Sequence, residues 1–326
     1  MKNMPDRQLM TRAAWFYYVA GLNQEATSQR MGLNRARVNK LLGQARDSGI
    51  VSITVNDRSL GLLHEEEAIK REFGLDFCIT TDPLGLEGIE VENKTTLDAL
   101  SLKAVGTAGA IFLRNYITEN SKAIVGTGWG RTLAHLSRQI SGANFPNVRF
   151  ISLMGSLTAN SSFNPFEVVQ ALAQATGGEG YFLPVPFIAD NPEDRNILIT
   201  QRAVARPMNL AKTADLALIS VGELTESSLL RQQDMISRKD LDELREAGAV
   251  GDTNGLFFNR EGHIVDHTLT QLTIGIGIAD LAKMRTVLLA GGLHKVAATE
   301  AILRGRFVRG LIIDGDSAKR LAERIA

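Results

Sequence analysis

A glycine-rich segment at residues 126–132 has the composition of an anion-binding loop. Three apolar residues precede the sequence GTGWGRT, and an apolar-periodic segment follows it. A strand, a glycine loop and a helix in that order direct backbone N–H groups at a ligand, as in many phosphate sites. The same pattern also fits a plain tight turn between a strand and a helix. The ligand-binding candidates in this segment are Gly126, Thr127, Gly128, Trp129, Gly130, Arg131 and Thr132.

Small residues also end several other apolar runs of the sequence. Glycine at such an end lets the backbone approach a ligand closely. Several ends of this kind indicate a ligand site more strongly than any single loop does. They add Gly155, Ser156 and Gly222 to the candidates, beside the pair Gly291 and Gly292.

Four further side chains could contact a ligand at these strand ends. Lys295 would open a helix, where a cation is unfavourable unless an anion lies beside it. Asp252 and Asn254 lie in the turn-rich segment VGDTNGLFFN, which we expect to be a loop. They could hydrogen-bond sugar hydroxyls or only shape the turn. Phe258 could stack on a sugar or belong to the core.

The N-terminal residues differ in charge from the rest of the chain. Residues 1–58 hold nine Lys or Arg and four Asp or Glu, a net charge of +5, and residues 59–326 carry −5. A basic segment attached to an acidic body indicates an anionic partner for the first part only.

Within this basic segment the pattern predicts a helix-turn-helix. A helical stretch at residues 7–20 precedes two helices that Asn23 and Asn34 would cap, with Gly32 in the turn between them. The last helix, from residue 35 to about 48, carries basic and amide side chains that suit phosphates and base edges. The predicted DNA-binding residues are Gln24, Asn34, Arg35, Arg37, Asn39, Lys40 and Gln44.

The basic segment and the rest of the chain predict two domains, 1–58 and 59–326. A strand at 50–55 would close the first domain. In the second, short apolar runs alternate with helical segments at 97–117, 132–140, 166–176 and 295–305, which predicts a parallel sheet covered on both faces. The predicted strands are 75–80, 122–128, 148–155, 181–186, 215–222, 273–277, 286–292 and 309–314. Ligands bind such sheets at the carboxyl ends of the strands.

Composition argues against several other classes of protein. No apolar run approaches the length of a membrane span, and no signal peptide is visible, so we expect a cytoplasmic protein without a membrane partner. The single cysteine, Cys78, excludes a disulfide framework within the chain. His263 and His267 are four residues apart in a segment that we expect to be a strand, which separates them too far for metal binding. We expect neither a metal nor another cofactor.

Four segments together resemble the SorC type of bacterial sugar-responsive transcription regulators, also called the sugar-binding DeoR-like group. They are ARVNKLLGQARDSGIVSITV, VGTGWGRTL, VGDTNGLFFNREG and AGGLHKVAATEAILRGRFVRGLIID, and the resemblance spans nearly the whole chain. Within the group the sequence is most similar to repressors of polyol catabolism of the erythritol type.

This resemblance implies an effector domain similar to ribose-5-phosphate isomerase and glucosamine-6-phosphate deaminase, and assembly as a homodimer or homotetramer. It implies that residues 126–132 form a phosphate-binding loop and that Lys295 is the basic group near the phosphate. Asp252, Asn254 and Phe258 match the segment that covers the ligand. Trp129 adds bulk to the loop, which leaves the ligand open between a sugar phosphate and a free sugar or polyol.

The sequence therefore favours a transcriptional regulator, which we expect to be a repressor, that binds double-stranded operator DNA under control of a small sugar, polyol or phosphorylated effector. The alternative is a sugar-phosphate isomerase or deaminase with a DNA-binding appendage, in which Asp252 or Glu223 could be the general base. No compact acid–base pair or nucleophile motif supports that alternative, so we expect no enzymatic activity. A DNA-binding structural protein without a ligand conflicts with the glycine-lined strand ends.

Overall fold

The computed structural model describes residues 5–51, 62–85, 94–140, 144–156 and 164–326. The chain divides into two units, Met1–Asp57 and Arg58–Ala326. The sequence-predicted boundary after residue 58 and most of the predicted strand at 50–55 lie outside the described residues. None of the helices in the described ranges is both long and apolar enough to cross a membrane.

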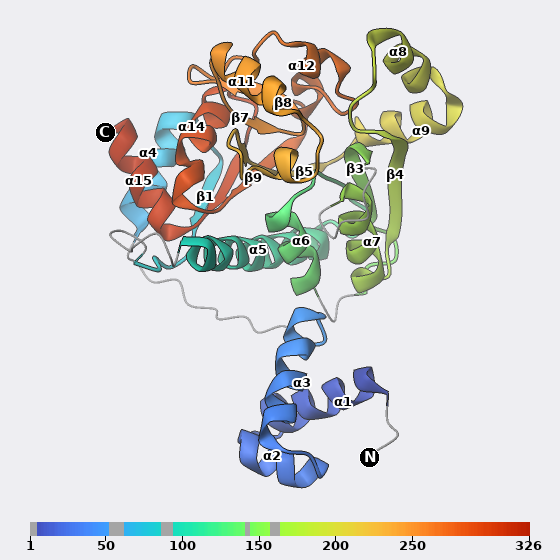
Figure 1. Ribbon diagram of the computed structural model, residues 1–326, viewed down its shortest axis with the longest axis vertical. Helices are drawn as coiled ribbons and strands as arrows, with labels where there is room; N and C mark the ends of the chain where they lie inside the picture. Colours follow the sequence, from blue (N-terminus) through green and yellow to red (C-terminus); the bar gives the residue numbers. More distant parts are fainter. Residues whose placement is uncertain (1–4, 52–61, 86–93, 141–143, 157–163) are drawn as a thin grey trace. The chain divides into compact units, whose positions relative to one another are not determined.

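The N-terminal unit is a helical bundle that contains the predicted helix-turn-helix (blue in Figure 1). It consists of α1 (Asp6–Ala14), which continues as the π-helical turn Trp15–Val19, then α2 (Gln24–Met31) and α3 (Arg35–Asp47). Both predicted caps are confirmed, because Asn23 Oδ1 accepts from Ala26 N at 2.8 Å and Asn34 Oδ1 accepts from Arg37 N at 2.7 Å. The buried core of the unit consists of Leu9, Ala13, Met31, Val38, Leu41 and Leu42.

The larger unit is built on a seven-stranded parallel sheet in the order β1-β10-β9-β5-β2-β3-β4. The strands in that order are Phe77–Thr80, Gly310–Ile313, Arg285–Ala290, Leu216–Ser220, Ile124–Thr127, Arg149–Ser156 and Glu179–Pro186. The predicted parallel α/β fold is confirmed. Short, fully apolar strands such as β5 form its centre because helices cover both faces of a parallel sheet.

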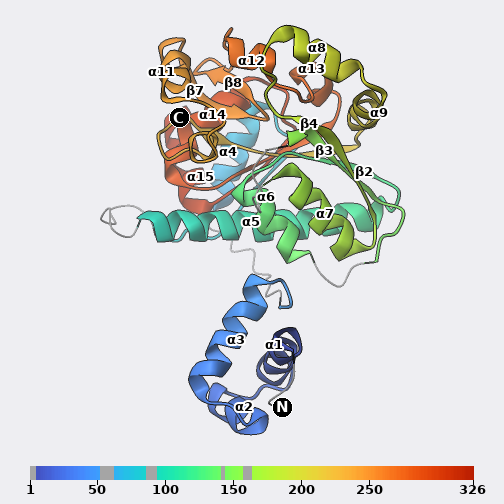
Figure 2. The ribbon, with the colours of Figure 1, turned by 45° about the vertical axis from the view of Figure 1, so that its right-hand side comes forward.

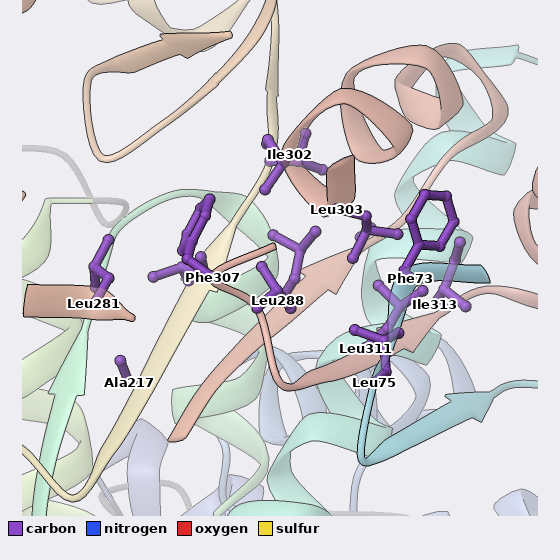
Figure 3. Packing of buried hydrophobic residues seen from close by; sticks show 14 of the residues in the cluster. Phe73, Leu75, Ala217, Leu281, Leu288, Ile302, Leu303, Phe307, Leu311 and Ile313 are labelled. Carbon is purple, nitrogen blue, oxygen red and sulfur yellow. The ribbon is translucent and has the colours of Figure 1, made fainter. Parts of the chain in front are cut away.

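Helices lie on the two faces of this sheet in separate groups (Figure 2). On one face α5 (Lys94–Glu119), α6 (Arg131–Gln139) and α7 (Pro165–Thr176) share one core cluster with the strands. The other face carries α4 (Leu63–Phe73), α9 (Arg202–Ala211), α14 (Val296–Arg304) and α15 (Gly315–Ile325). There Phe73 and Phe307 pack with Leu303 and the strand residues Leu311 and Ile313 (Figure 3).

A smaller antiparallel sheet follows the carboxyl end of β5. It contains β6 (Gly222–Glu223), β7 (Ala249–Thr253) and β8 (Leu256–Asn259). The helices α10 (Leu229–Gln232), α11 (Arg238–Glu246) and α12 (Thr268–Leu272) share a core cluster with this sheet. Helix α8 (Pro192–Thr200) lies beside α9 and α12, and α13 (Ile278–Leu281) contributes Leu281 to the core of the large sheet.

This part of the fold corrects three local predictions. The segment 250–259 is mostly a β-hairpin rather than a loop, with Asn254 and Gly255 both at positive φ in its turn. Residues 273–277 form only isolated bridges, because Thr273 pairs with Ile188 and Gly275 with Met154 outside any ladder. The segment around His267 is not a strand, since His267 caps α12 instead.

Candidate functional site

A cavity opens at the topological switch point of the large sheet. Strands β2 and β5 are neighbours; the chain continues from β2 through β3 to β4 on one side, and from β5 through β9 to β10 on the other. Loops that leave such a point in opposite directions form a crevice at the carboxyl ends of the strands. The cavity lined by these loops encloses about 510 Å³, its open mouth included.

Eight of the sequence-predicted ligand residues come together in this cavity. They are Trp129, Gly130, Arg131, Thr132, Gly222, Asp252, Asn254 and Lys295. They arrive from the ends of three parallel strands and from the β7–β8 hairpin, so no short stretch of sequence contains the site.

The loop after β2 leads directly into an uncapped helix. Gly130 has a φ of +109° and precedes α6, whose first turn has no side-chain cap. Ser220 Oγ donates to Trp129 O at 2.7 Å and ties this loop to the end of β5. Uncapped N–H groups at the start of a nine-residue helix present partial positive charge to the cavity.

Trp129 is packed into the wall of the cavity. Its side chain is buried, and its ring centroid lies 6.1 Å from that of Phe187. Two residues further on, Arg131 donates a hydrogen bond to Gln232 in α10. The indole therefore occupies part of the space beside the loop, and α10 closes the opposite side.

Two charged groups form an ion pair inside the cavity. Lys295 Nζ lies 3.5 Å from Glu223 Oε2, and each side chain is only 11% exposed. The same Nζ donates to Val221 O at 3.2 Å. His294 extends the cluster, because its Nδ1 lies 3.2 Å from Asp98 Oδ1 and its Nε2 lies 3.9 Å from Glu223 Oε1.

Asp252 is a second acidic group in the cavity, and it is almost completely buried. Its pKa is raised to about 7, chiefly by burial and also by the nearby Glu223, while the Gly255 backbone N–H and Lys295 oppose the rise. A Cβ atom on Gly222 would come within 2.1 Å of Asp252 Oδ1, so only glycine fits opposite this carboxyl group.

Asn254 presents an amide donor without a partner in the described part of the chain. Its side chain is buried, and its Nδ2 makes no hydrogen bond to any of those residues. A Cβ atom on Gly128 would come within 2.5 Å of Asn254 Oδ1, which explains the glycine at that position. A buried polar atom without a partner costs about 1–3 kcal/mol, so this amide is suited to a ligand that supplies an acceptor.

The structure places the remaining predicted ligand residues outside the cavity. A Cβ on Gly126 would meet Leu153 Cδ2 at 2.5 Å, so this glycine serves packing within the core. Gly155 lies close to Pro186 O in the adjacent strand, and Ser156 pairs with the same residue. Thr127 is buried at the end of β2, and Phe258 stacks on Phe307 in the core at 5.7 Å.

Sequence reasoning missed about half of the cavity wall. The sequence singles out Glu223 only as a possible general base of the enzymatic alternative, although its position beside Gly222 is also a signal for the effector site. The residues from α10 carried no such signal, because they reach the site from a short helix of ordinary composition. The unpredicted lining residues are Ser220, Val221, Glu223, Ser228, Leu229 and Leu230.

The helix-turn-helix presents a second candidate site on α2 and α3. Arg35 Nε donates to Gln24 Oε1 at 3.2 Å, and Gln24 Nε2 lies 3.4 Å from Asn39 Oδ1. Arg37 pairs with Asp6 at 2.8 Å, while Lys40 is exposed. These side chains are available to a nucleic acid.

The other two predicted DNA-binding residues, Asn34 and Gln44, are less exposed to contacts through their amide oxygens. The Asn34 side chain is committed to its cap. Gln44 has its amide oxygen buried without a partner.

Among the described residues, no three His, Cys, Asp or Glu side chains are grouped so as to hold a metal ion.

A helix-turn-helix unit joined to an α/β unit with a polar cavity at its switch point defines a ligand-responsive transcriptional regulator.

Comparison with known proteins identifies the family. Residues 57–323 match the Sugar-bind family model, described as "Putative sugar-binding domain". The chain belongs to this family of SorC- and DeoR-type transcriptional regulators. It is 34% identical over 316 residues to the erythritol catabolism regulatory protein EryD of Brucella abortus, covering 97% of this chain and 96% of that protein. It is 28% identical to the deoxyribonucleoside regulator of Bacillus subtilis, covering 97% of each chain.

Solved structures show the same fold. The full-length sorbitol operon regulator SorC of Klebsiella pneumoniae matches with a TM-score of 0.68 at 22% identity, covering 97% of this chain and 99% of that one. A transcriptional regulator of Streptococcus pneumoniae matches with a TM-score of 0.71 over 81% of this chain and 97% of that one, also at 22% identity.

Proposed function

We propose that this regulator binds operator DNA through α2 and α3 and represses a sugar or polyol catabolic operon until an effector occupies the cavity. The observation that carries the proposal is the polar cavity at the switch point, which is lined by Asp252, Asn254, Glu223 and Lys295. Hydroxyl-rich ligands suit these groups, since carboxylates accept hydrogen bonds and amides and ammonium groups donate them. The similarity to regulators of erythritol catabolism and of a sorbitol operon supports an effector of this class.

The proposed effector contacts are the cavity residues that the sequence predicted, together with Ser220 and Glu223. The proposed DNA contacts are Arg35, Arg37, Asn39 and Lys40, with Gln24 holding Arg35. One helix-turn-helix contacts few base pairs, so a homodimer or homotetramer on paired half-sites is part of the proposal. Binding to chromosomal DNA would place the chain in the bacterial cytoplasm.

We further propose that the cavity senses its ligand without converting it. Glu223 is paired with Lys295, and the buried Asp252 is held next to the Gly255 backbone N–H. Neither carboxyl group is therefore positioned as a free base. Purified protein should show no turnover of ribose 5-phosphate or glucosamine 6-phosphate, and measurable turnover would support the enzymatic alternative.

A gel-shift titration tests the regulatory function. DNA from upstream of the chain's own operon should be retained in preference to unrelated DNA, with an affinity that falls as salt rises. Addition of erythritol, ribitol or their phosphates should then release it. Salt-insensitive binding, or equal binding to every DNA, would contradict the proposal.

A further inference from the structure

We propose that Glu223 makes this cavity selective for uncharged polyols and against their phosphates. The inference rests on the proposed function, because it names the class of effector that the same cavity takes. It assigns a role in ligand specificity to Glu223, which directly follows Gly222 in β6.

The first observation is that the cation inside the cavity is already neutralised. Lys295 Nζ lies 3.5 Å from Glu223 Oε2, and both side chains are nearly buried. A phosphate dianion at Lys295 would have to displace or face this carboxylate. Like charges at short range in a poorly solvated site repel strongly, so the ion pair disfavours an anionic ligand.

A second acidic side chain strengthens this bias. Asp252 is 3% exposed and lies near Glu223, and no described side chain forms a salt bridge with it. A phosphate in the cavity would stabilise the protonated form of this group and disfavour its carboxylate. An uncharged polyol has no such conflict, because its hydroxyl groups can donate to either form of the acid.

The remaining cationic group also has a protein partner. Arg131 follows the loop at the start of α6 and donates to Gln232. Trp129, which packs on Phe187 at 6.1 Å, brings an apolar surface to the same loop. Because Gln232 is neutral, Arg131 keeps its charge, but this hydrogen bond commits part of its guanidinium group to the protein.

The unpartnered donor in the cavity fits an uncharged ligand. Asn254 Nδ2 is buried and makes no hydrogen bond within the ranges that the structure describes. A hydroxyl oxygen can accept from this amide while its proton is donated to Asp252 or Glu223. A chain of hydroxyl groups thus satisfies the amide and the carboxyl groups together, which a terminal phosphate does not.

Calorimetric titration of the full chain tests the inference. The probes are erythritol and ribitol, their monophosphates, and inorganic phosphate, each added to the wild type, Glu223→Gln and Glu226→Gln. Glu226 is a suitable control because it is half exposed and pairs with Arg231 and Arg238 outside the Lys295 pair.

The wild type should bind a polyol at least tenfold more tightly than the corresponding monophosphate. Glu223→Gln should shift the ratio at least tenfold towards the phosphate, and Glu226→Gln should leave it unchanged. Tighter binding of phosphates by the wild type would overturn the inference alone, and this comparison needs no variant to fold. Binding of neither class, with no release of operator DNA, would overturn the proposed function as well.

Discussion

Lys295 Nζ and Glu223 Oε2 lie 3.5 Å apart inside the cavity, and neither side chain is more than 11% exposed. These residues are 72 positions apart in the sequence, on the segments that follow β9 and β5. Their pairing lets a lysine lie at the start of α14, where a cation opposes the helix dipole. Glu223 therefore supplies the negative charge beside Lys295, so the position of the lysine does not by itself indicate an external anion.

Removing one member of this pair should destabilise the protein strongly. Lys295→Met leaves a buried carboxylate without its partner, which costs about 3–5 kcal/mol in comparable pairs. The double variant Lys295→Met with Glu223→Gln should recover much of that loss, because no charge is left unpaired. Urea unfolding of the single and double variants measures the difference.

A surface pair provides the control for this experiment. Lys283 Nζ lies 3.1 Å from Asp280 Oδ1, but the lysine side chain is 72% exposed. Lys283→Met should therefore change the free energy of unfolding by less than about 1 kcal/mol. Equal losses for Lys295→Met and Lys283→Met would show that the cavity pair is not effectively buried.

The buried Asp252 should give the protein a measurable pH dependence. Its pKa rises from 3.8 to about 7 because burial disfavours the charged form, with Glu223 and Lys295 as its charged neighbours. The folded state then holds a proton that the unfolded state loses. The stability from this group is fully present below about pH 4 and is lost as the pH rises to about 7, by up to about 1.4 kcal/mol per pH unit.

Asp252→Asn removes this titration and isolates its contribution. As the pH rises from 4 to 7, the wild type should lose stability relative to the variant. Above pH 7 the difference between their free energies of unfolding should stay constant. Urea unfolding at several pH values measures the two curves. Parallel curves across that range would contradict the raised pKa.

Apolar patterning predicted the fold because the central strands are buried on both faces. The apolar runs at residues 123–125, which lead into β2, and 216–219 in β5 are visible directly in the sequence. The same reasoning failed at residues 273–277, where an apolar run forms only isolated bridges. Whether such a run joins a ladder depends on its neighbours in space, and these are absent from local sequence.

Only part of the cavity wall could be predicted from the sequence, again because local sequence does not show which residues are neighbours in space. Glycines at or after strand ends are predicted to be ligand contacts, and of these Gly130 and Gly222 line the cavity. Gly126 and Gly155 instead leave room for Leu153 and Pro186. Spacing alone cannot separate these two uses of glycine.

Gly128→Ala should impair effector binding more than it impairs folding. The new methyl group would come within 2.5 Å of Asn254 Oδ1, so the amide must move away from its position in the cavity. Because a side-chain end can shift, we expect a loss of at least tenfold in effector affinity with an unfolding midpoint close to the wild type.

Gly277→Ala is a matched control for that substitution. Gly277 lies outside the cavity, and a Cβ atom there would meet no atom within 4 Å. Effector affinity should stay unchanged in this variant. Calorimetric titration of both variants with erythritol checks the prediction, and unchanged affinity in Gly128→Ala would show that Asn254 does not contact the ligand.

Substitutions at Arg35 and Lys40 in α3 should change DNA binding in different ways. We expect Arg35 to contribute to sequence specificity and Lys40 to affinity for any DNA. Gln24 holds Arg35 at 3.2 Å at the start of α3, where side chains face base edges in the major groove. Arg35→Ala should therefore weaken binding to the operator by about 1–3 kcal/mol, and it should reduce the difference in affinity between the operator and unrelated DNA.

Lys40 is exposed on the same helix with no partner among the described residues, so Lys40→Ala should weaken binding to every sequence alike. It should also reduce the slope of log affinity against log salt by about 1, which fluorescence anisotropy at several salt concentrations measures. Arg12→Ala, an exposed arginine on α1, should leave both quantities unchanged, and a loss equal to that of Arg35→Ala would move the DNA interface to α1.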